Sequence, residues 1–444
     1  MISEDLDRQW QLRGDHYMSL TTDVNLTVAR PSASGYGGGY TSTVSGELSE
    51  FTSHYQGAFA EIRSQIDTLI RPWRDLPSVA SLADVVDDID EVAALLNGDF
   101  VVEAADLVPV VPNEALTDAL EIVHSHISGM GGGTIAAFKE KFLIKLQSVV
   151  DRYFGISAIC KNSAEAEREI WQKTEQRLVE IVEAFDGAMT AIANSGTPSV
   201  DESLGILKFA LNVASFVPGP VGAGAKAGSS VFKLTELVTG KKFWTPQNTS
   251  TYSAQIQDLT NALSGLQEHA RSAESELRTT IRTSIAGVQN NPRLFDLQVD
   301  PPEDTGEEVV IYANEISNIV NDHLPTIYSE LKKAATTNDA WAIESPLTRQ
   351  EAGLAPAGAA SEITELQEIL SALLLDLAVE VAEGSVQLGE ALKDFIDVEE
   401  QVVDDLEKYI KELDGTYTDD PLHDPASPHS RPIPPPHGFH MRAV

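Results

Sequence analysis

The sequence predicts a mostly α-helical protein, an elongated bundle of long antiparallel helices with one apolar helical hairpin and a disordered C-terminal tail. Three observations support this prediction. Apolar residues recur at steps of three and four over several long segments, which is typical of amphipathic helices. Alternation typical of strands is scarce, with short candidates only at 99–111 and 307–314. Residues 414–444 are rich in proline and show no apolar periodicity.

The first part of the chain divides into an N-terminal segment with a Gly-rich linker, residues 1–46, and the first half of the bundle, residues 47–200. In that half, two stretches carry a single apolar stripe: Phe51, Tyr55, Phe59, Ile62, Ile66, Leu69 and Trp73, then Ile170, Thr174, Leu178, Ile181, Phe185, Met189 and Ile192. A helix with one apolar stripe is stable only when that stripe lies against other helices. The pattern therefore predicts antiparallel packing like that of a coiled coil.

Residues 201–245 form the predicted hairpin. Residues 204–217 are apolar on almost every helical face, which indicates a helix in a protein core or in lipid. Pro218-Gly219-Pro220 breaks that helix, and residues 221–238 resume it. The residues expected to contact a membrane or a partner are Leu207, Phe209, Leu211, Val213, Phe216, Val217, Pro218, Pro220 and Val221.

Two interpretations of the hairpin remain open. Its small residues allow two helices to approach closely at one end of the bundle, and the composition favours this docked arrangement. Alternatively, the hairpin leaves the bundle and enters a bilayer, where small residues also suit close helix packing. Each helical arm would be about 21 to 27 Å long.

The second half of the bundle covers residues 246–413. Its apolar stripes run from Ile256 to Val288 and from Ile363 to Leu413. A helix of about 40 residues is roughly 60 Å long, so these lengths predict a rod. Residues 414–444 complete the division as a disordered tail rich in Pro and His.

Charge and composition exclude several classes of function. The chain has 31 basic and 68 acidic residues and a formal net charge of -37, which repels nucleic acid. A single cysteine, Cys160, excludes an intramolecular disulfide. The first residues, MISEDLDRQW, lack a basic and an apolar region, so we expect no Sec-type signal peptide. No apolar run reaches 18 residues, so we expect no permanent transmembrane helix.

The sequence offers no arrangement that indicates an enzyme. His124 and His126 form a H-x-H pair without fixed further ligands, and the glycine loops near residues 35–40 and 129–134 lack the Lys-Ser/Thr of a phosphate loop. We therefore expect no catalytic residues, no cofactor, no metal and no small-molecule substrate.

A helical segment with Trp73 near its turn, followed by Asp-Leu-Pro, resembles the WXG100 and related type VII (ESX) secretion proteins of actinobacteria. The Gly/Ala hairpin between two helical halves and the Pro-rich tail are similar to larger members of that class, over about residues 45–290. The chain departs from the class in two places. Arg74 and Asp75 follow Trp73 in place of x-Gly, and Leu413 lies four residues after Tyr409 in place of the acidic residue of the export motif. The resemblance implies a helical protein that acts through other proteins, and it transfers no site residue.

The layout also resembles the cytolysin-A-like α-pore-forming toxins, which combine a long helical bundle with one apolar hairpin. That resemblance implies a soluble form that hides an apolar tongue.

These arguments lead to one functional expectation and one alternative. The expectation is a non-enzymatic, secreted or surface-associated protein that assembles with protein partners or with itself in a type VII-like context. The alternative is a component of an α-pore-forming toxin whose hairpin, about residues 204–239, inserts into a target membrane. A cytoplasmic location stays open.

Overall fold

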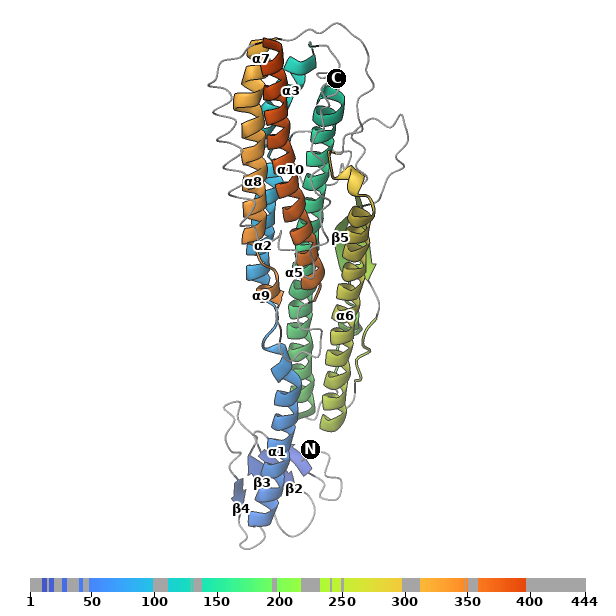
Figure 1. The fold of residues 1–444 in the computed structure, drawn as a ribbon. Coiled ribbons are helices and arrows are strands. Elements are labelled where there is room, and N and C mark those ends of the chain that lie inside the picture. The colour runs from blue at the N-terminus through green and yellow to red at the C-terminus, as the bar shows by residue number, and fades with distance from the viewer. Residues whose placement is uncertain are drawn as a thin grey trace.

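The computed structural model describes residues 10–13, 16–19, 26–29, 40–42, 48–98, 111–128, 130, 138–193, 198–216, 232–239, 242–248, 251–297, 312–347, 349 and 358–396. Most of these residues are helical, which confirms the predicted mostly α class. The long helices lie side by side and give an elongated molecule (Figure 1). The predicted tail and most residues of the two strand candidates fall outside the described ranges.

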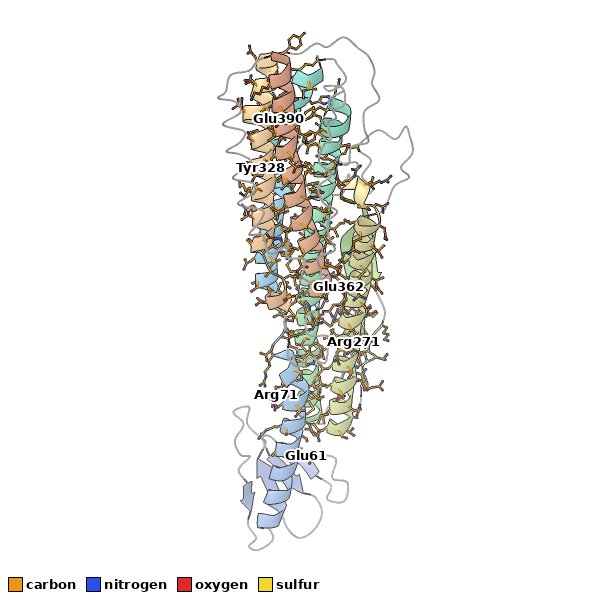
Figure 2. All side chains as sticks on the ribbon, viewed as in Figure 1. Glu61, Arg71, Arg271, Tyr328, Glu362 and Glu390 are labelled. Atoms are coloured by element: carbon orange, nitrogen blue, oxygen red, sulfur yellow. The ribbon has the colours of Figure 1, made fainter. Side chains whose placement is uncertain are left out.

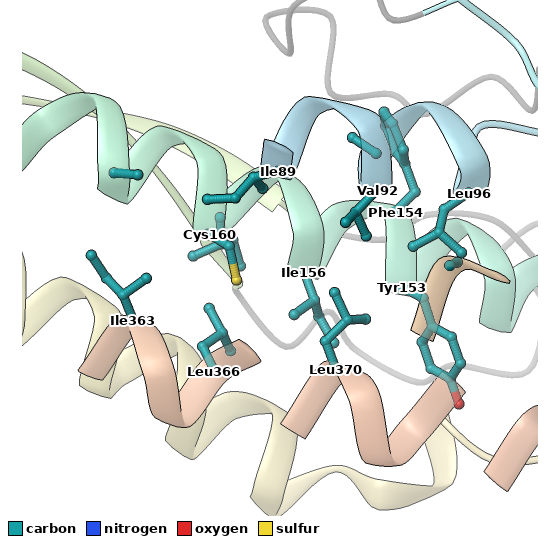
Figure 3. Close-up of a cluster of buried hydrophobic side chains, with 14 of the residues drawn as sticks. Ile89, Val92, Leu96, Tyr153, Phe154, Ile156, Cys160, Ile363, Leu366 and Leu370 are labelled. Carbon is teal, nitrogen blue, oxygen red and sulfur yellow. The ribbon is translucent and has the colours of Figure 1, made fainter. Parts of the chain in front are cut away.

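The longest helix, α5 (Ile144–Ala193), has 50 residues and follows the short π-helix η3 (Lys139–Leu143). At 1.5 Å per residue it is about 75 Å long. Its N-terminal half is buried on several sides, because residues at adjacent positions are all covered: Val149, Val150, Tyr153, Phe154, Ile156, Ile159 and Cys160. These residues meet α2 (Val79–Leu96) and α10 (Ala360–Ile396) (Figure 3).

A second group of helices packs on α2 and α10, directly or through α8. It consists of α3 (Glu114–Ser128), α7 (Ala313–Asn318), the π-helix η6 (Ile319–His323), α8 (Leu324–Ala340) and the short α9 (Glu344–Leu347). A buried polar network fastens α8 to α10. Asn338 Nδ2 donates to Gln367 O at 2.9 Å and to Ser371 Oγ at 2.8 Å. Because these groups are out of water, each hydrogen bond also fixes how the two helices align.

On the other side of α5 lies α6 (Tyr252–Asn290), with η5 (Pro292–Leu294) after it. The apolar stripe predicted for this helix is half-buried at Ile256 and buried from there on: Leu259, Leu263, Leu266, Ala270, Ala273, Leu277, Ile281, Ile285 and Val288. Charged side chains extend outward along the rod (Figure 2). One of them, Arg282 on α6, pairs with Glu362 of α10 at 2.6 Å.

The N-terminal part holds α1 (Leu48–Ile70) and the turn η2 (Arg71–Trp73), which match the helix expected at residues 51–73. Before α1, a four-stranded antiparallel sheet has the order β1 (Trp10–Arg13), β2 (His16–Ser19), β3 (Leu26–Ala29) and β4 (Tyr40–Ser42). These strands were not predicted from the sequence. Each has only three or four residues, too few for a periodic signal.

The predicted helical hairpin is wrong in its secondary structure. After the turn η4 (Glu202–Gly205), the two arms are antiparallel strands, β5 (Phe209–Phe216) and β6 (Phe232–Thr239). A continuous apolar run fits a buried strand as well as a buried helix. Here the aromatic and β-branched residues of FALNVASF, together with the nearby prolines and glycines, favour the strand.

Candidate functional site: a docked β-hairpin and two buried carboxyl clusters

The β5–β6 hairpin is in regular antiparallel register. Phe209 is opposite Thr239 at its base and Phe216 is opposite Phe232 at the far end. Strand β5 contacts both α5 and α6, so the hairpin lies along the seam between the two longest helices. Figure 1 shows the hairpin beside α6.

The hairpin is apolar at most of its positions. Strand β5 has no charged residue, and its polar members are Asn212 and Ser215. The register places these two opposite the charged residues of β6, Glu236 and Lys233. Since strand positions alternate between two faces, each face holds one such polar pair, and the face of Ser215 also carries Thr235 and Thr239 of β6. A helical surface can cover only one face of a two-stranded sheet.

The base of the hairpin is held through its backbone carbonyls. The Leu207 carbonyl lies 2.9 Å from His269 Nε2 of α6, and Arg177 Nη2 of α5 donates to the Ile206 carbonyl at 3.2 Å. Leu207 itself is buried, with 4% of its surface exposed. Side chains of α5 and α6 therefore hold the chain in place just before β5 begins.

The segment that leaves the hairpin, residues 242–248, packs closely on its surroundings. A Cβ added at Gly205 would lie 1.9 Å from Trp244 O, and one added at Gly265 of α6 would lie 2.4 Å from Phe243 O. Only glycine permits backbone contacts this close. Both glycines therefore position the second leg of the hairpin.

Asp258 of α6 completes this anchor. Its Oδ1 accepts from Trp244 Nε1 and its Oδ2 accepts from the Gln247 backbone N–H, both at 2.8 Å. Asp258 is 3% exposed and Trp244 is 7% exposed, so the indole N–H would be buried without an acceptor if Asp258 were replaced. A shallow pocket beside this contact is lined by Ile181, Ala184, Phe185, Val200, Trp244, Gln255, Asp258 and Leu259.

The predicted hairpin residues separate into three groups. Leu207 is buried at the base. Phe209, Leu211, Val213 and Phe216 lie within β5. Val217, Pro218, Pro220 and Val221 lie outside the described residues.

A first buried carboxyl cluster joins α5, α6 and the chain just before α10. Arg349 donates to both oxygens of Glu274, at 2.5 and 2.7 Å, and its guanidinium lies 4.6 Å from the centre of the Trp171 ring. Glu167 Oε1 accepts from the Ala359 N–H at 2.7 Å. Burial, followed by repulsion from Glu274, raises the pKa of Glu167 to about 8.

A second cluster lies along α10. Burial raises the pKa of Asp376 to about 7, and Asp296 and Glu383 add to the effect. Burial and a hydrogen bond with Asp296 raise the pKa of Glu380 to about 9. The neighbouring Tyr153 donates from its hydroxyl to Phe295 O at 2.8 Å. Burial raises the pKa of that hydroxyl well above its usual value, with Asp376, Glu380 and Asp296 contributing.

Neither carboxyl cluster was predicted from the sequence, although the sequence carries one signal for the first cluster. Glu167 lies three residues before Ile170 and Glu274 four after Ala270, so each carboxylate falls on an apolar stripe. A charge at such a position is buried unless the helix rotates, and burial then requires a partner.

The structure also locates the histidine pair and the single cysteine of the sequence. His124 is exposed on α3, and the ring of His126 meets that of His323 at 6.4 Å. In the described part of the chain, no group of three or more His, Cys, Asp or Glu side chains is arranged to hold a metal ion. Cys160 is buried, and that burial raises the pKa of its thiol. Among the described helices, none has both the length and the apolar character needed to cross a bilayer.

Comparison of the chain with protein-family models, with curated proteins and with solved structures gives no match.

Proposed function

We propose that the protein is a non-enzymatic, membrane-inserting component similar to the α-pore-forming toxins, and that its β5–β6 hairpin leaves the helices to enter a target bilayer. The observation that supports this proposal is an apolar hairpin whose first strand carries no charge and which lies along the α5–α6 seam. An apolar segment that packs on the surface of helices is suited to move from that contact into the apolar core of a bilayer.

The dimensions of the hairpin are compatible with lipid. Each eight-residue strand spans about 26 Å at 3.3 Å per residue, close to the ~30 Å hydrocarbon core. The connecting residues 217–231 contain one charged residue, Lys226. They would extend the apolar length beyond the strands.

A two-stranded sheet has unpaired backbone groups along both edges, and lipid offers them no partner. Insertion therefore requires the edges to be closed by hairpins from other copies. The proposed active form is an oligomer at the membrane of a target cell. The protein would be secreted or exposed at the cell surface before it binds. The net charge of -37 argues against a nucleic-acid partner.

A second candidate is assembly with another protein in a type VII-like secretion context. One observation favours it. Two large apolar side chains are exposed, Val179 on α5 at 50% and Ile206 at the hairpin base at 39%. A partner could cover the exposed face of α5 that carries Val179.

Dye leakage from liposomes tests the first proposal, with F216D in the hairpin as the variant and V179D as the matched control. We expect wild type and V179D to release dye and F216D to release none while keeping the wild-type circular dichroism spectrum. If the wild type neither binds nor permeabilises liposomes between pH 5 and 9.5, the membrane proposal is wrong. A partner that co-purifies with wild type and is lost with V179D would then support the assembly function.

A further inference from the structure

Helix α10 is the last helix of the described chain, and it covers the core from one side. It packs on α5, α6 and α8. Figure 3 shows Cys160 on α5 directed toward α10 at Leu366, with Ile363 nearby. All three residues are fully buried. Separation of α10 from α5 would therefore expose the single thiol of the protein.

The cluster at the start of α10 has two carboxyl groups and one guanidinium at its centre. Arg349 directs two N–H groups at Glu274, so this pair is neutral as a unit. Arg278 and Arg271 of α6 also act on Glu274. Glu167 accepts the Ala359 N–H through Oε1, one residue before α10 begins.

Glu167 Oε2 and Trp171 Nε1 are both buried, and neither makes a hydrogen bond of regular geometry. The two groups still interact, because Arg349 and the Trp171 indole lower the pKa of Glu167 against the larger effect of burial. An ionised Glu167 would leave an excess negative charge in the core at this point, which is costly.

The cluster along α10 also brings carboxyl groups together. Asp296, which follows η5, acts on both Asp376 and Glu380 of α10, and Glu383 acts on Asp376. Tyr153 and Arg152 of α5 lie on the same side, and Arg152 Nη1 donates to the Leu294 carbonyl. Asp376 Oδ1 is buried without a hydrogen-bond partner. Glu380 shares a hydrogen bond with Asp296, an arrangement that needs a proton on one of the two groups.

We propose that α10 is a strap that is released at alkaline pH. Glu167 of α5 loses its proton beside Ala359, the residue before α10, and the Asp376–Glu380 group loses protons along α10. The resulting charges loosen α10 from α5 and α6. Glu167 contacts the residue that precedes α10, and Asp376 and Glu380 of α10 lie near Tyr153 of α5, so the charges that appear on deprotonation lie beside the contact of α10 with α5. This release of α10 does not depend on the membrane activity proposed for the hairpin.

The direction of the effect follows from proton linkage. Packed against α5, Glu167 keeps its proton up to a pKa of about 8, whereas in a released strap its pKa would return to about 4.5. The packed state binds more protons between these values, so a rise in pH favours release. From pH 6.5 to pH 9.5, this one residue would increase the released population about 30-fold. The Asp376–Glu380 group acts in the same direction.

Labelling of Cys160 with a thiol reagent measures release in the intact chain. The variants are E167Q and E380Q, singly and combined, because Gln mimics the protonated carboxyl group. The control is E175Q, at an exposed position of α5. Rates are compared between variants at one pH, so the intrinsic rise of thiol reactivity with pH cancels.

We expect the ratio of the wild-type labelling rate to that of the double variant to be at least tenfold larger at pH 9.5 than at pH 6.5, and we expect E175Q to match wild type at both pH values. E167Q and E380Q should each give an intermediate rate. Equal rates for wild type and the double variant at pH 9.5, with both folded by circular dichroism, would overturn the proposal. So would a wild-type excess that is the same at both pH values, because it would reflect packing alone.

Discussion

Arg349 and Glu274 form a buried ion pair in which two guanidinium N–H groups meet the two carboxylate oxygens at 2.5 and 2.7 Å, with side-chain exposures of 1% and 0%. The pair connects α6 to a residue between α9 and α10, 75 positions later in the chain. Such a pair adds little net stability, because the cost of removing both ions from water offsets their attraction, but removal of one partner alone is costly.

Replacing Arg349 with Met should lower the free energy of unfolding by about 3–5 kcal/mol, because Glu274 would be left buried without its cation. Removing both partners in E274L/R349M should cost less than R349M alone, since no unpaired charge remains. Urea unfolding followed by circular dichroism gives both values. A double variant that costs the sum of the two single changes would show that the pair is not coupled.

Gly358 should tolerate no side chain. Its φ is +52°, and an added Cβ would lie 2.7 Å from Glu167 Oε1 and 3.0 Å from Glu274 Oε1. We expect G358A to reduce the free energy of unfolding by about 1–3 kcal/mol. The matched control is G187A, on an exposed part of α5 where an added Cβ meets nothing within 4 Å. It should raise stability by about 0.5–1 kcal/mol. Thermal unfolding of both variants tests the opposite signs.

Global stability should fall as pH rises from 6 to 9. Asp376 and Glu380 have pKa values of about 7 and about 9 in the folded protein, raised chiefly by burial from 3.8 and 4.5. The folded state therefore holds more protons than the unfolded state, and this stabilisation is lost as pH rises through 7 to 9. We expect a lower urea midpoint at pH 9 than at pH 6.

The double variant D376N/E380Q should flatten that pH dependence, whereas E368Q, at an exposed position of the same helix, should leave it unchanged. A wild-type midpoint that rises over this range would contradict the assignment of protons to the buried carboxyl groups.

Asp258 should control how firmly the second leg of the hairpin is held. In D258A the buried Trp244 indole N–H loses its acceptor, which costs about 1–3 kcal/mol, and the Gln247 N–H of an exposed residue loses its acceptor as well. W244F removes only one of these bonds and serves as the comparison. We expect D258A to be less stable than W244F, and to release liposome dye faster than wild type. Slower release by folded D258A would argue against undocking as a step in insertion.

The sequence predicted the helices that have one apolar stripe and missed the buried part of α5. The stripe from Leu259 to Val288 locates α6 to within a few residues. The start of α5, 26 residues before Ile170, was not predicted. Residues there are covered on several sides, so Val149, Val150, Tyr153 and Phe154 show no periodic contrast between apolar and polar positions.

The two arms of the hairpin were located by the sequence, but their secondary structure was not. The residues of β5 were singled out because they are uncharged and apolar, and that property does not distinguish a strand from a helix. The carboxyl clusters depend on contacts between distant residues, such as Glu167 with Ala359, 192 positions apart. A single sequence does not reveal such contacts, except where a charged residue falls on an apolar stripe.

The position of α10 in the chain has a consequence for synthesis. The face of α5 around Cys160 is completed only by Ile363 and Leu366, about 200 residues later. At 5–20 residues per second, that apolar face would stay uncovered for roughly 10–40 seconds on the ribosome. Nascent chains that stop before α10 should therefore bind chaperones and aggregate, and chains that include it should not.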